Sequence, residues 1–342
     1  MWALIGLPPL QGQVDRMYRE PATHLHVKPL SRRSPGEVQM AAPKRAVVWG
    51  IAFHLVVGNH PAAAQASPWS DSLLPRLRAA ARMVPGQRPA TIRVLRFGGG
   101  DVPESAFLQD GGAQLVPAVY TVFQLRFADG WIMVDAGLDP DVAGDTTAAF
   151  RAHNDTVQLA LLGARSIVVT HEHHDHVAGV VRTPALAAIT PKTLLTREQV
   201  RTLQYRPNLP LIRLDSAAAA AYPVVDFDLL LSLAPGVVLV RAAGHTPGSQ
   251  IVYVQGLNGE EVLLIGDVAW SMTGVEQRRQ KPEAASTQYG EDRVALQAQL
   301  DWLNWVGTNT AVTIVNSHDN RWLADLIRRG ILVEGLDLSG RP

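Results

Sequence analysis

The sequence predicts a layered α/β domain that begins near Thr91 and continues to the C-terminus. Short runs rich in β-branched residues recur along this region, which is typical of buried strands. Stretches with apolar residues at helical spacing lie between these runs, so strands and helices alternate along the chain. The region is long for one core, but its length is within the range of a single layered domain, and no solenoid-type repeat is visible in it.

Local patterns define the individual elements. Asp129-Gly130 predicts a hairpin turn between two strands. Strands are expected at residues 92–97, 120–127, 131–134, 166–169, 211–214, 237–242, 251–254, 262–265 and 312–315. Helices are expected at residues 196–203, 293–306 and 321–329, with Gly330 ending the last one. Residues 217–221 are expected to form either a helical turn or a loop.

The first 66 residues are expected to lie outside the folded domain. Residues 40–45 are basic, residues 46–58 are apolar, and small residues lead up to Ala66, which together predict a secretory signal peptide cleaved after that residue. The apolar run is shorter than the roughly 20 residues that span a bilayer, so no stable membrane anchor is expected. Residues 1–39 show no periodicity, and we expect them to be a start-site artefact or a disordered extension.

The mature protein is therefore expected in the periplasm or outside the cell, beginning at Ser67. Residues 67–90 predict an N-terminal helical arm, because Leu73, Leu74 and Leu77 have helical spacing. Residues 91–342 are expected to form the main domain.

Composition excludes some classes of partner and ligand. Removal of residues 1–66 leaves 24 Lys and Arg against 28 Asp and Glu, a formal net charge of −4. Such a chain has no basic stripe for a polyanion, so nucleic acid is not expected as a partner, and a small-molecule substrate is. The chain has no cysteine, which excludes both a disulfide framework and a thiolate metal ligand.

Potential metal ligands are concentrated in Thr170-His171-Glu172-His173-His174-Asp175-His176, directly after the strand expected at residues 166–169. Neutral imidazoles and a carboxylate suit a borderline divalent cation such as zinc. This strand end therefore predicts a metal site. The histidines without a partner at ligand spacing are expected to have ordinary structural roles; they are His24, His26, His54, His60 and His153.

Three further segments, Gly244-His245-Thr246-Pro247-Gly248-Ser249, Gly266-Asp267 and Ser317-His318-Asp319, follow the H-x-H-x-D-H pattern. In this order, the four segments resemble the metal-binding signature of the metallo-β-lactamase superfamily. The resemblance implies that family's four-layer αββα sandwich. It also implies that one metal ion is bound by His171, His173 and His245, and a second by Asp175, His176 and His318, with Asp267 bridging the two. Two zinc ions per chain are expected, with iron and manganese as alternatives.

The resemblance also implies roles near the ligands. Asp135, in a Val-Asp-Ala-Gly turn, is expected either to accept the spare N–H of a ligand imidazole or only to cap its turn. Asp175 is expected to orient the nucleophile and to pass a proton to the leaving group. His174 and Glu172 are left out of the ligand set, because an extended segment would direct His174 away from His173. Glu291, near the start of an expected helix, is given no catalytic role.

An Asp at the bridging position is typical of lactonases, thioesterases, phosphodiesterases and organophosphate hydrolases of the family, whereas β-lactamases usually have Cys or Ser there. Trp270 stands three residues after Asp267, where acyl-homoserine lactonases commonly have Tyr, so this chain lacks that hydroxyl but keeps an aromatic wall. We therefore expect an exported dinuclear zinc hydrolase that cleaves a small ester, lactone or related acyl substrate.

Two alternatives stay open at this stage. A β-lactam hydrolase is favoured by the signal peptide and the His-Thr-Pro-Gly-Ser loop, which resemble those of periplasmic β-lactamases. A mononuclear iron enzyme of the persulfide-dioxygenase kind shares the H-x-H-x-D-H segment but does not need the second set of ligands. Substrate choice is expected to depend on residues 97–119 and 270–290, both predicted as loops. The glycines of the first loop make it either a mobile flap over the site or an ordinary connection.

Overall fold

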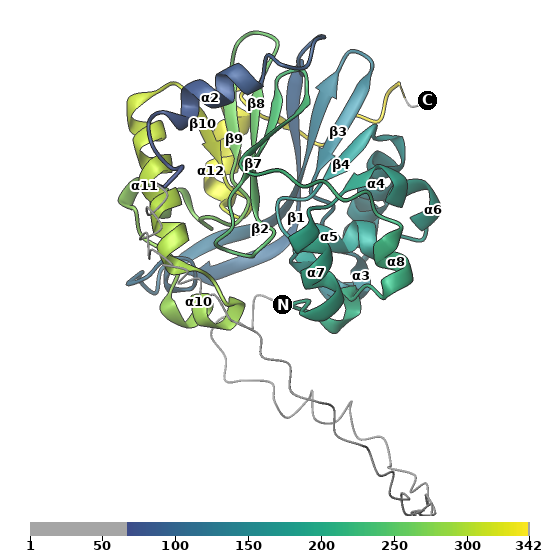
Figure 1. Ribbon diagram of the computed structural model, residues 1–342. Coiled ribbons are helices and arrows are strands. Elements are labelled where there is room, and N and C mark those ends of the chain that lie inside the picture. The colour runs from purple at the N-terminus through teal and green to yellow at the C-terminus, as the bar shows by residue number, and fades with distance from the viewer. Residues whose placement is uncertain (1–66, 341–342) are drawn as a thin grey trace, which may run out of the picture. The chain divides into compact units, whose positions relative to one another are not determined.

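The computed structural model describes residues 67–340 of the 342-residue chain. The predicted signal peptide and the segment at residues 1–39 lie outside the described residues. Two β-sheets lie at the centre of the described part, and helices cover the outer face of each (Figure 1). This arrangement is the αββα sandwich that the family resemblance implied. Within residues 67–340, no helix is both long enough and apolar enough to cross a membrane.

The first sheet has six strands in the order β11-β1-β2-β3-β4-β5. The strands are β1 (Thr91–Pro103), β2 (Leu115–Phe127), β3 (Gly130–Val134), β4 (Ser166–Val168), β5 (Thr193–Leu194) and β11 (Val333–Glu334). Neighbours β1, β2 and β3 are antiparallel, whereas β3, β4 and β5 run parallel to one another. The predicted hairpin at Asp129-Gly130 joins β2 to β3.

The second sheet has five strands in the order β10-β9-β8-β7-β6. The strands are β6 (Leu230–Ala234), β7 (Val237–Arg241), β8 (Gln250–Gln255), β9 (Glu261–Leu264) and β10 (Thr313–Val315). Strands β6 to β9 are antiparallel, and β10 runs parallel to β9. Strands β7, β9 and β10 therefore all point in the same direction.

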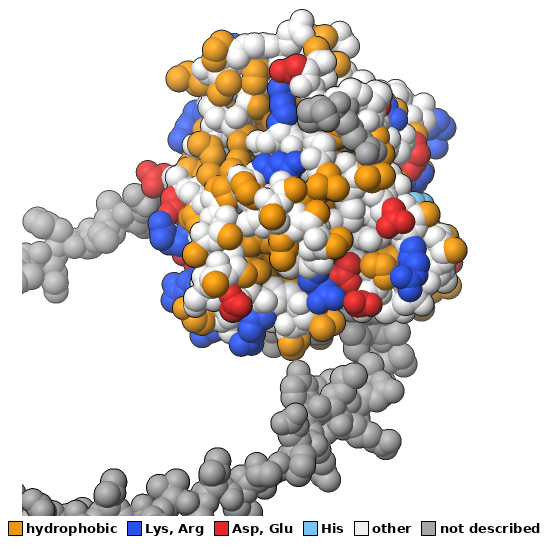
Figure 2. All heavy atoms as spheres, turned by 90° about the vertical axis from the view of Figure 1, so that its right-hand side faces the viewer, with side chains coloured by type: hydrophobic (Ala, Val, Ile, Leu, Met, Phe, Trp, Pro, Cys, Tyr) orange, Lys and Arg blue, Asp and Glu red, His pale blue; other side chains and the backbone are white. Residues whose placement is uncertain are grey.

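Helices α4 (Ala148–Gly163) and α5 (His174–Val181) pack on the first sheet, and α2 (Leu73–Ala80) and α11 (Arg293–Asn309) pack on the second. The remaining helices are α3 (Pro140–Ala143), α6 (Leu186–Ile189), α7 (Arg197–Tyr205), α8 (Ser216–Ala220), α9 (Met272–Gln277), α10 (Glu283–Tyr289) and α12 (Asn320–Arg328). Short 3-10 helices are η2 (Glu104–Ala106), η3 (Thr190–Lys192) and η4 (Pro210–Ile212). On the face shown in Figure 2, charged side chains of both signs are scattered among hydrophobic ones.

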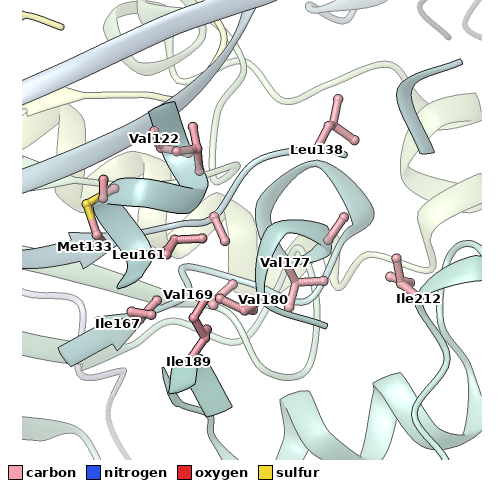
Figure 3. Close-up of a cluster of buried hydrophobic side chains, with 14 of the residues drawn as sticks. Val122, Met133, Leu138, Leu161, Ile167, Val169, Val177, Val180, Ile189 and Ile212 are labelled. Carbon is pink, nitrogen blue, oxygen red and sulfur yellow. The ribbon is translucent and has the colours of Figure 1, made fainter. Parts of the chain in front are cut away.

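Alternate residues of each central strand belong to different layers, as the two-residue period of a strand requires. In β3, Met133 packs toward α4 and α5, whereas Val134 packs between the sheets. In β8, Tyr253 packs toward α2 and α11, and Val252 packs between the sheets. Figure 3 shows part of the cluster under α4 and α5, with Val177 and Val180 of α5 near Ile167 and Val169. Both faces of each sheet are thus buried.

Three sequence predictions differ from the structure. Residues 211–214 are not a strand: Pro210 begins η4, whose first turn suits the fixed φ of proline, and Ile212 and Leu214 are buried without strand partners. Residues 97–119 are mostly not a loop, because β1 and β2 extend into them beyond a register shift between Phe97 and Gly100. Residues 270–290 contain α9 and α10 rather than only loop.

Candidate metal centre

The predicted ligands come from strand ends that meet at one edge of the two sheets. His171 and Asp267 follow the C-terminal ends of β4 and β9, His245 lies in the loop after β7, and His318 follows β10. Cross-sheet hydrogen bonds join these ends. The amide of Gln250 donates to the carbonyl of Thr170 (2.8 Å), and the amide of Val119 donates to the carbonyl of His318 (3.2 Å). Side chains far apart in the sequence therefore converge.

The H-x-H-x-D-H segment changes from extended to helical within itself. His173 has extended backbone angles (φ −76°, ψ 156°) and precedes α5, which begins at His174. The first turn of α5 directs Asp175 and His176 toward the ligands from the other strand ends, with His176 Nε2 3.4 Å from Asp267 Oδ1. His174 lies elsewhere, with its Nδ1 2.7 Å from the side-chain nitrogen of Asn208. His174 is thus outside the ligand groups, but the predicted reason, alternation in an extended segment, was wrong.

The seven side chains that the resemblance implied as ligands lie together in the structure. They form three overlapping groups, and within each group the ligand atoms lie within 4.8 Å of one another. The first group is His171, His173 and His245, and the second is His171, His176 and Asp267. The third group is Asp175, His176 and His318. Asp175 is the most exposed of the seven, with 12% of its side chain accessible. The centre is therefore most accessible to solvent on the side of Asp175.

Asp267 lies between the two outer groups, and imidazoles of both groups face its carboxylate. Its Oδ2 is 3.7 Å from His171 Nε2 and 3.5 Å from His245 Nε2. Its Oδ1 is 3.4 Å from His176 Nε2 and 3.1 Å from His318 Nε2, which is also 3.2 Å from Oδ2. A carboxylate placed in this way can bind two cations at once.

These residues fit a divalent metal ion. The Nε2 atoms of His171, His176 and His245 and the Oδ1 atom of Asp267 are buried and have no hydrogen-bond partner among the described residues. Buried polar atoms are normally paired, and four unpaired ones that face one another match the donor atoms a metal requires. The centre therefore implies a divalent metal ion.

Electrostatics support the same conclusion. Burial and the neighbouring imidazoles lower the pKa of His171 and His173 well below the ordinary value, so both are neutral and able to coordinate. Burial also lowers the pKa of His176, but Asp175, Asp135 and Asp267 together raise it well above that value. Burial raises the pKa of Asp267, yet the surrounding imidazoles lower it well below its usual range. The carboxylate of Asp267 is therefore ionised and able to bind a cation.

Asp135 supports His176 from the side away from the other ligands. Its Oδ2 lies 2.9 Å from His176 Nδ1, and its Oδ1 accepts the amide of Thr170 (2.6 Å). Asp135 is fully buried and has a positive φ of 66°, an uncommon conformation that Asp tolerates better than most residues. Of the two roles expected for Asp135, contact with a ligand imidazole is the one present in the structure.

Glu172 is buried beside the ligands but does not join them. It accepts a hydrogen bond from the Thr246 hydroxyl (2.7 Å) and one from the Gly248 amide (3.2 Å). A Cβ on Gly248 would lie 2.6 Å from Glu172 Oε2 and 2.4 Å from Gln199 Cγ, so only glycine allows this close approach. Glu172 thus fixes the loop that carries His245.

Sequence reasoning missed the partner of His245. Glu291, which was given no catalytic role, places its Oε1 2.5 Å from His245 Nδ1 and 2.6 Å from the Nζ of Lys281. No spacing signal links Glu291 to His245, 46 positions earlier. One hint pointed to its partner Lys281. Lys192 and Lys281 are the two lysines between residues 67 and 340, where the other basic side chains are arginines, so a lysine is an unusual choice in this chain.

Two aromatic residues line the centre. Trp270 is buried, and its indole N–H donates to Asp267 Oδ2 (2.8 Å). Tyr289 of α10 has its ring centroid 5.1 Å from that of His173 and 5.8 Å from that of Trp270. Burial, Asp175 and Asp267 raise the pKa of Tyr289, so its phenol stays protonated and can donate a hydrogen bond. Tyr289 was not singled out from the sequence.

Comparison with known proteins identifies the same family. The model of the metallo-β-lactamase superfamily matches residues 116–285. An N-acyl homoserine lactone hydrolase with N-hexanoyl-L-homoserine at its catalytic metal centre is 16% identical over 70% of this chain and 97% of that chain, with a TM-score of 0.54. A variant of the B. thuringiensis protein AiiA with N-decanoyl-L-homoserine at its active site is 17% identical over 70% and 97%, with a TM-score of 0.53.

A probable metal-dependent hydrolase from Staphylococcus aureus is 14% identical over 69% of this chain and 91% of that chain, with a TM-score of 0.50. No curated protein matches the chain by sequence. At these identities the solved structures establish a shared fold, and the family match adds the superfamily. Together with the buried His and Asp groups, they show that the chain belongs to the metallo-β-lactamase superfamily, as a metal-dependent hydrolase.

Proposed function

We propose that the protein is an exported hydrolase with two zinc ions that cleaves a small ester, lactone or related acyl substrate. The position of Asp267 carries the proposal, because its carboxylate lies between two buried groups of three ligands each. A chain that used one metal ion would have no need for Asp175, His176 and His318 as a second buried group. Ligands that are all nitrogen and oxygen, with several imidazoles, suit zinc.

The seven ligands would hold the two ions close together, with His171, His173 and His245 on one side of Asp267 and Asp175, His176 and His318 on the other. Two divalent ions held in this way activate water near neutral pH and polarise the acyl oxygen of a substrate. The buried side chains orient the ligands in advance, so little reorganisation is needed during the reaction.

Asp175 is the residue that we propose to move protons. Its Oδ2 faces His176 Nε2 (3.6 Å) and His318 Nε2 (3.5 Å), and it lies on the accessible side of the centre. Burial raises the pKa of Asp175, but His176, His174 and His318 lower it below the ordinary value, so the group is ionised at neutral pH. The carboxylate can accept a proton from the attacking water and pass it to the leaving oxygen.

Tyr289 and Trp270 are proposed to form the aromatic side of the substrate pocket. The protonated phenol of Tyr289, beside His173, can donate a hydrogen bond to a substrate oxygen. The indole N–H of Trp270 is already used by Asp267, so Trp270 contributes a wall rather than a donor to substrate. This assignment sharpens the sequence prediction for Trp270.

The lactone hypothesis draws support from structurally similar proteins that hold N-hexanoyl-L-homoserine at the catalytic metal centre or N-decanoyl-L-homoserine at the active site. The two alternatives, a β-lactam hydrolase and a mononuclear iron dioxygenase, predict different substrates and metal contents. A small molecule is proposed rather than nucleic acid, in keeping with the net charge of −4 calculated for residues 67–342.

A substrate panel tests this proposal. The zinc-loaded protein would be assayed with acyl-homoserine lactones, nitrophenyl esters and β-lactams, before and after removal of metal with a chelator. We expect turnover of lactones or esters that is lost with the metal and restored by zinc. Turnover confined to β-lactams, or activity that survives complete metal removal, would contradict the proposal.

A further inference from the structure

A buried ion pair lies directly behind one half of the metal centre. The carboxylate of Glu291 is fully buried, and the ammonium of Lys281 belongs to a side chain that is 2% exposed. Their closest atoms are 2.6 Å apart. Burying two charges is unfavourable unless each is paired and hydrogen-bonded. Both charged groups of this pair therefore need further hydrogen-bond partners, and both have them.

Both members of the pair contact the metal centre. Glu291 Oε1 lies 2.5 Å from Nδ1 of His245, and its Oε2 accepts the Ser286 hydroxyl (2.7 Å). Lys281 donates to the backbone carbonyl of Asp267 (2.5 Å), and its Nζ lies 5.1 Å from the centroid of the Trp270 ring. The pair thus links the loop that carries His245 to the turn that carries Asp267.

The pair also brackets α10. Lys281 precedes this helix and Glu291 follows it, and the amide of Glu291 donates to the carbonyl of Ser286 (2.9 Å). Arg293 strengthens the closure by donating to the Lys281 carbonyl (3.2 Å) and to the Ser286 hydroxyl (2.7 Å). The ion pair therefore joins the two ends of α10, the helix labelled in Figure 1, beside the loop that carries His245.

The contacts of the pair are confined to one group of ligands and the bridge. Glu291 contacts His245, and Lys281 contacts His245 and Asp267. The other group depends on different support: Asp135 contacts His176, and the carbonyl of Val119 accepts from His318. Carboxylates that orient a ligand imidazole typically change metal affinity by about 10 to 100-fold when they are mutated.

We infer that Lys281 and Glu291 are positioning residues that selectively set the metal affinity of the group formed by His171, His173 and His245. Glu291 orients the His245 ring so that Nε2 of His245 faces the metal site. Lys281 fixes the position of Glu291 relative to the turn that carries Asp267. The inference rests on the proposed function only in assuming that the group of His171, His173 and His245 binds metal.

Zinc affinity measured in two one-site backgrounds tests the selectivity. In H318A, the group of His171, His173 and His245 remains, and E291Q should weaken its zinc binding about 10-fold. In H173A, the other group remains, and E291Q should leave its affinity unchanged. D135N is the matched control and should show the opposite pattern, because Asp135 supports His176. Competition with a chromophoric chelator measures each affinity without any substrate.

E291Q keeps the size of the side chain and an acceptor for His245, so it is the variant chosen to remain folded. K281M should weaken the same zinc ion as E291Q, since Glu291 then loses its buried partner. Equal weakening in both backgrounds, or no weakening in H318A, would overturn the inference. If the unmutated full chain binds a single zinc ion, the dinuclear proposal fails, while the E291Q effect in H318A is still measurable and decides the inference separately.

Discussion

His176 and His245 are each oriented by a buried carboxylate, but the two supports are of different kinds. Asp135, behind His176, is otherwise satisfied by neutral donors, the amide and hydroxyl of Thr170. Glu291, behind His245, is satisfied by the cation of Lys281 and the hydroxyl of Ser286. One half of the metal centre is thus supported by neutral hydrogen bonds and the other by an ion pair.

The two supports also differ in how local they are. Asp135 and Thr170 follow the ends of the neighbouring parallel strands β3 and β4, so the pairing of the strands places them together. Lys281 and Glu291 lie on either side of α10 and meet only when this helix packs against Val102, Ala118 and Trp270. The comparison shows that the position of Asp135, at the end of a strand, is fixed by the register of the sheet. The position of Glu291, at the end of a helix, depends instead on how that helix packs.

Removal of the Asp267 carboxylate, which faces both ligand groups, should have the largest effect. D267A deletes the carboxylate that faces all four neighbouring imidazoles, and it should lower hydrolysis by orders of magnitude and release one metal ion. Turnover and metal content per chain measure the two effects, and D301A, on an exposed position of α11, serves as control. Turnover like that of the unmutated chain would remove the bridging role from Asp267.

D135N should weaken the centre more than E291Q. The D135N substitution replaces one acceptor oxygen with an NH2 donor, which leaves either Thr170 or His176 Nδ1 without its acceptor and favours the His176 tautomer with a protonated Nε2. The amide introduced by E291Q can still accept from His245 while its NH2 group turns toward Ser286. We expect a zinc affinity loss near the upper end of the 10 to 100-fold range for D135N. A larger loss in E291Q would reverse the comparison.

Y289F tests whether α10 contributes to the reaction as well as to the wall of the site. Loss of one hydrogen bond to a substrate oxygen should lower kcat/KM about 10-fold, corresponding to roughly 1.4 kcal/mol, without changing metal content. The matched control is Y205F, because Tyr205 lies on α7 and is 69% exposed. Unchanged kinetics in Y289F would restrict Tyr289 to a packing role.

The ion pair of Arg78 and Glu261 offers a partly exposed counterpart to the pair of Lys281 and Glu291. Burial raises the pKa of Glu261, but hydrogen bonds from Arg78 and Tyr253 lower it below the ordinary value of 4.5. Its stabilising contribution is therefore present above that value and is lost as the pH falls through the lowered folded pKa. E261Q should lower the melting temperature of the metal-free protein at pH 7 and have little effect well below pH 4.5. A deficit independent of pH would contradict this account.

The smallest effect is expected from H153A. His153 lies on α4, with its ring centroid 6.3 Å from that of Phe97, and it belongs to none of the ligand groups. Turnover and zinc content should equal those of the unmutated protein. A folded but inactive H153A would show that the site extends to α4.

The parts of the molecule that sequence predicts well are those with local signals. The strands ending near Asp135 and His171 have β-branched runs, and the ligand segments follow a family pattern, so their convergence could be expected before the structure was known. The αββα arrangement followed from the resemblance rather than from periodicity. Helix α4 was not expected, although Phe150, Val157 and Leu161 are buried on one side of it.

The supporting residues have no such signals. Glu291 is an ordinary acid near a helix start, and only the packing of α10 brings it to His245. Tyr289 lies near the end of a segment predicted as loop, where its position cannot be derived from spacing. The register shift after Phe97 likewise results from pairing with β2, which no local pattern specifies. Long-range packing thus decides the details that tune the centre.

The metal content of the purified chain beginning at Ser67 tests the central claim most directly. Elemental mass spectrometry without added metal should find close to two zinc ions per chain, one for each group of ligands facing Asp267. Close to one iron ion per chain would contradict the dinuclear hydrolase and would favour the dioxygenase alternative.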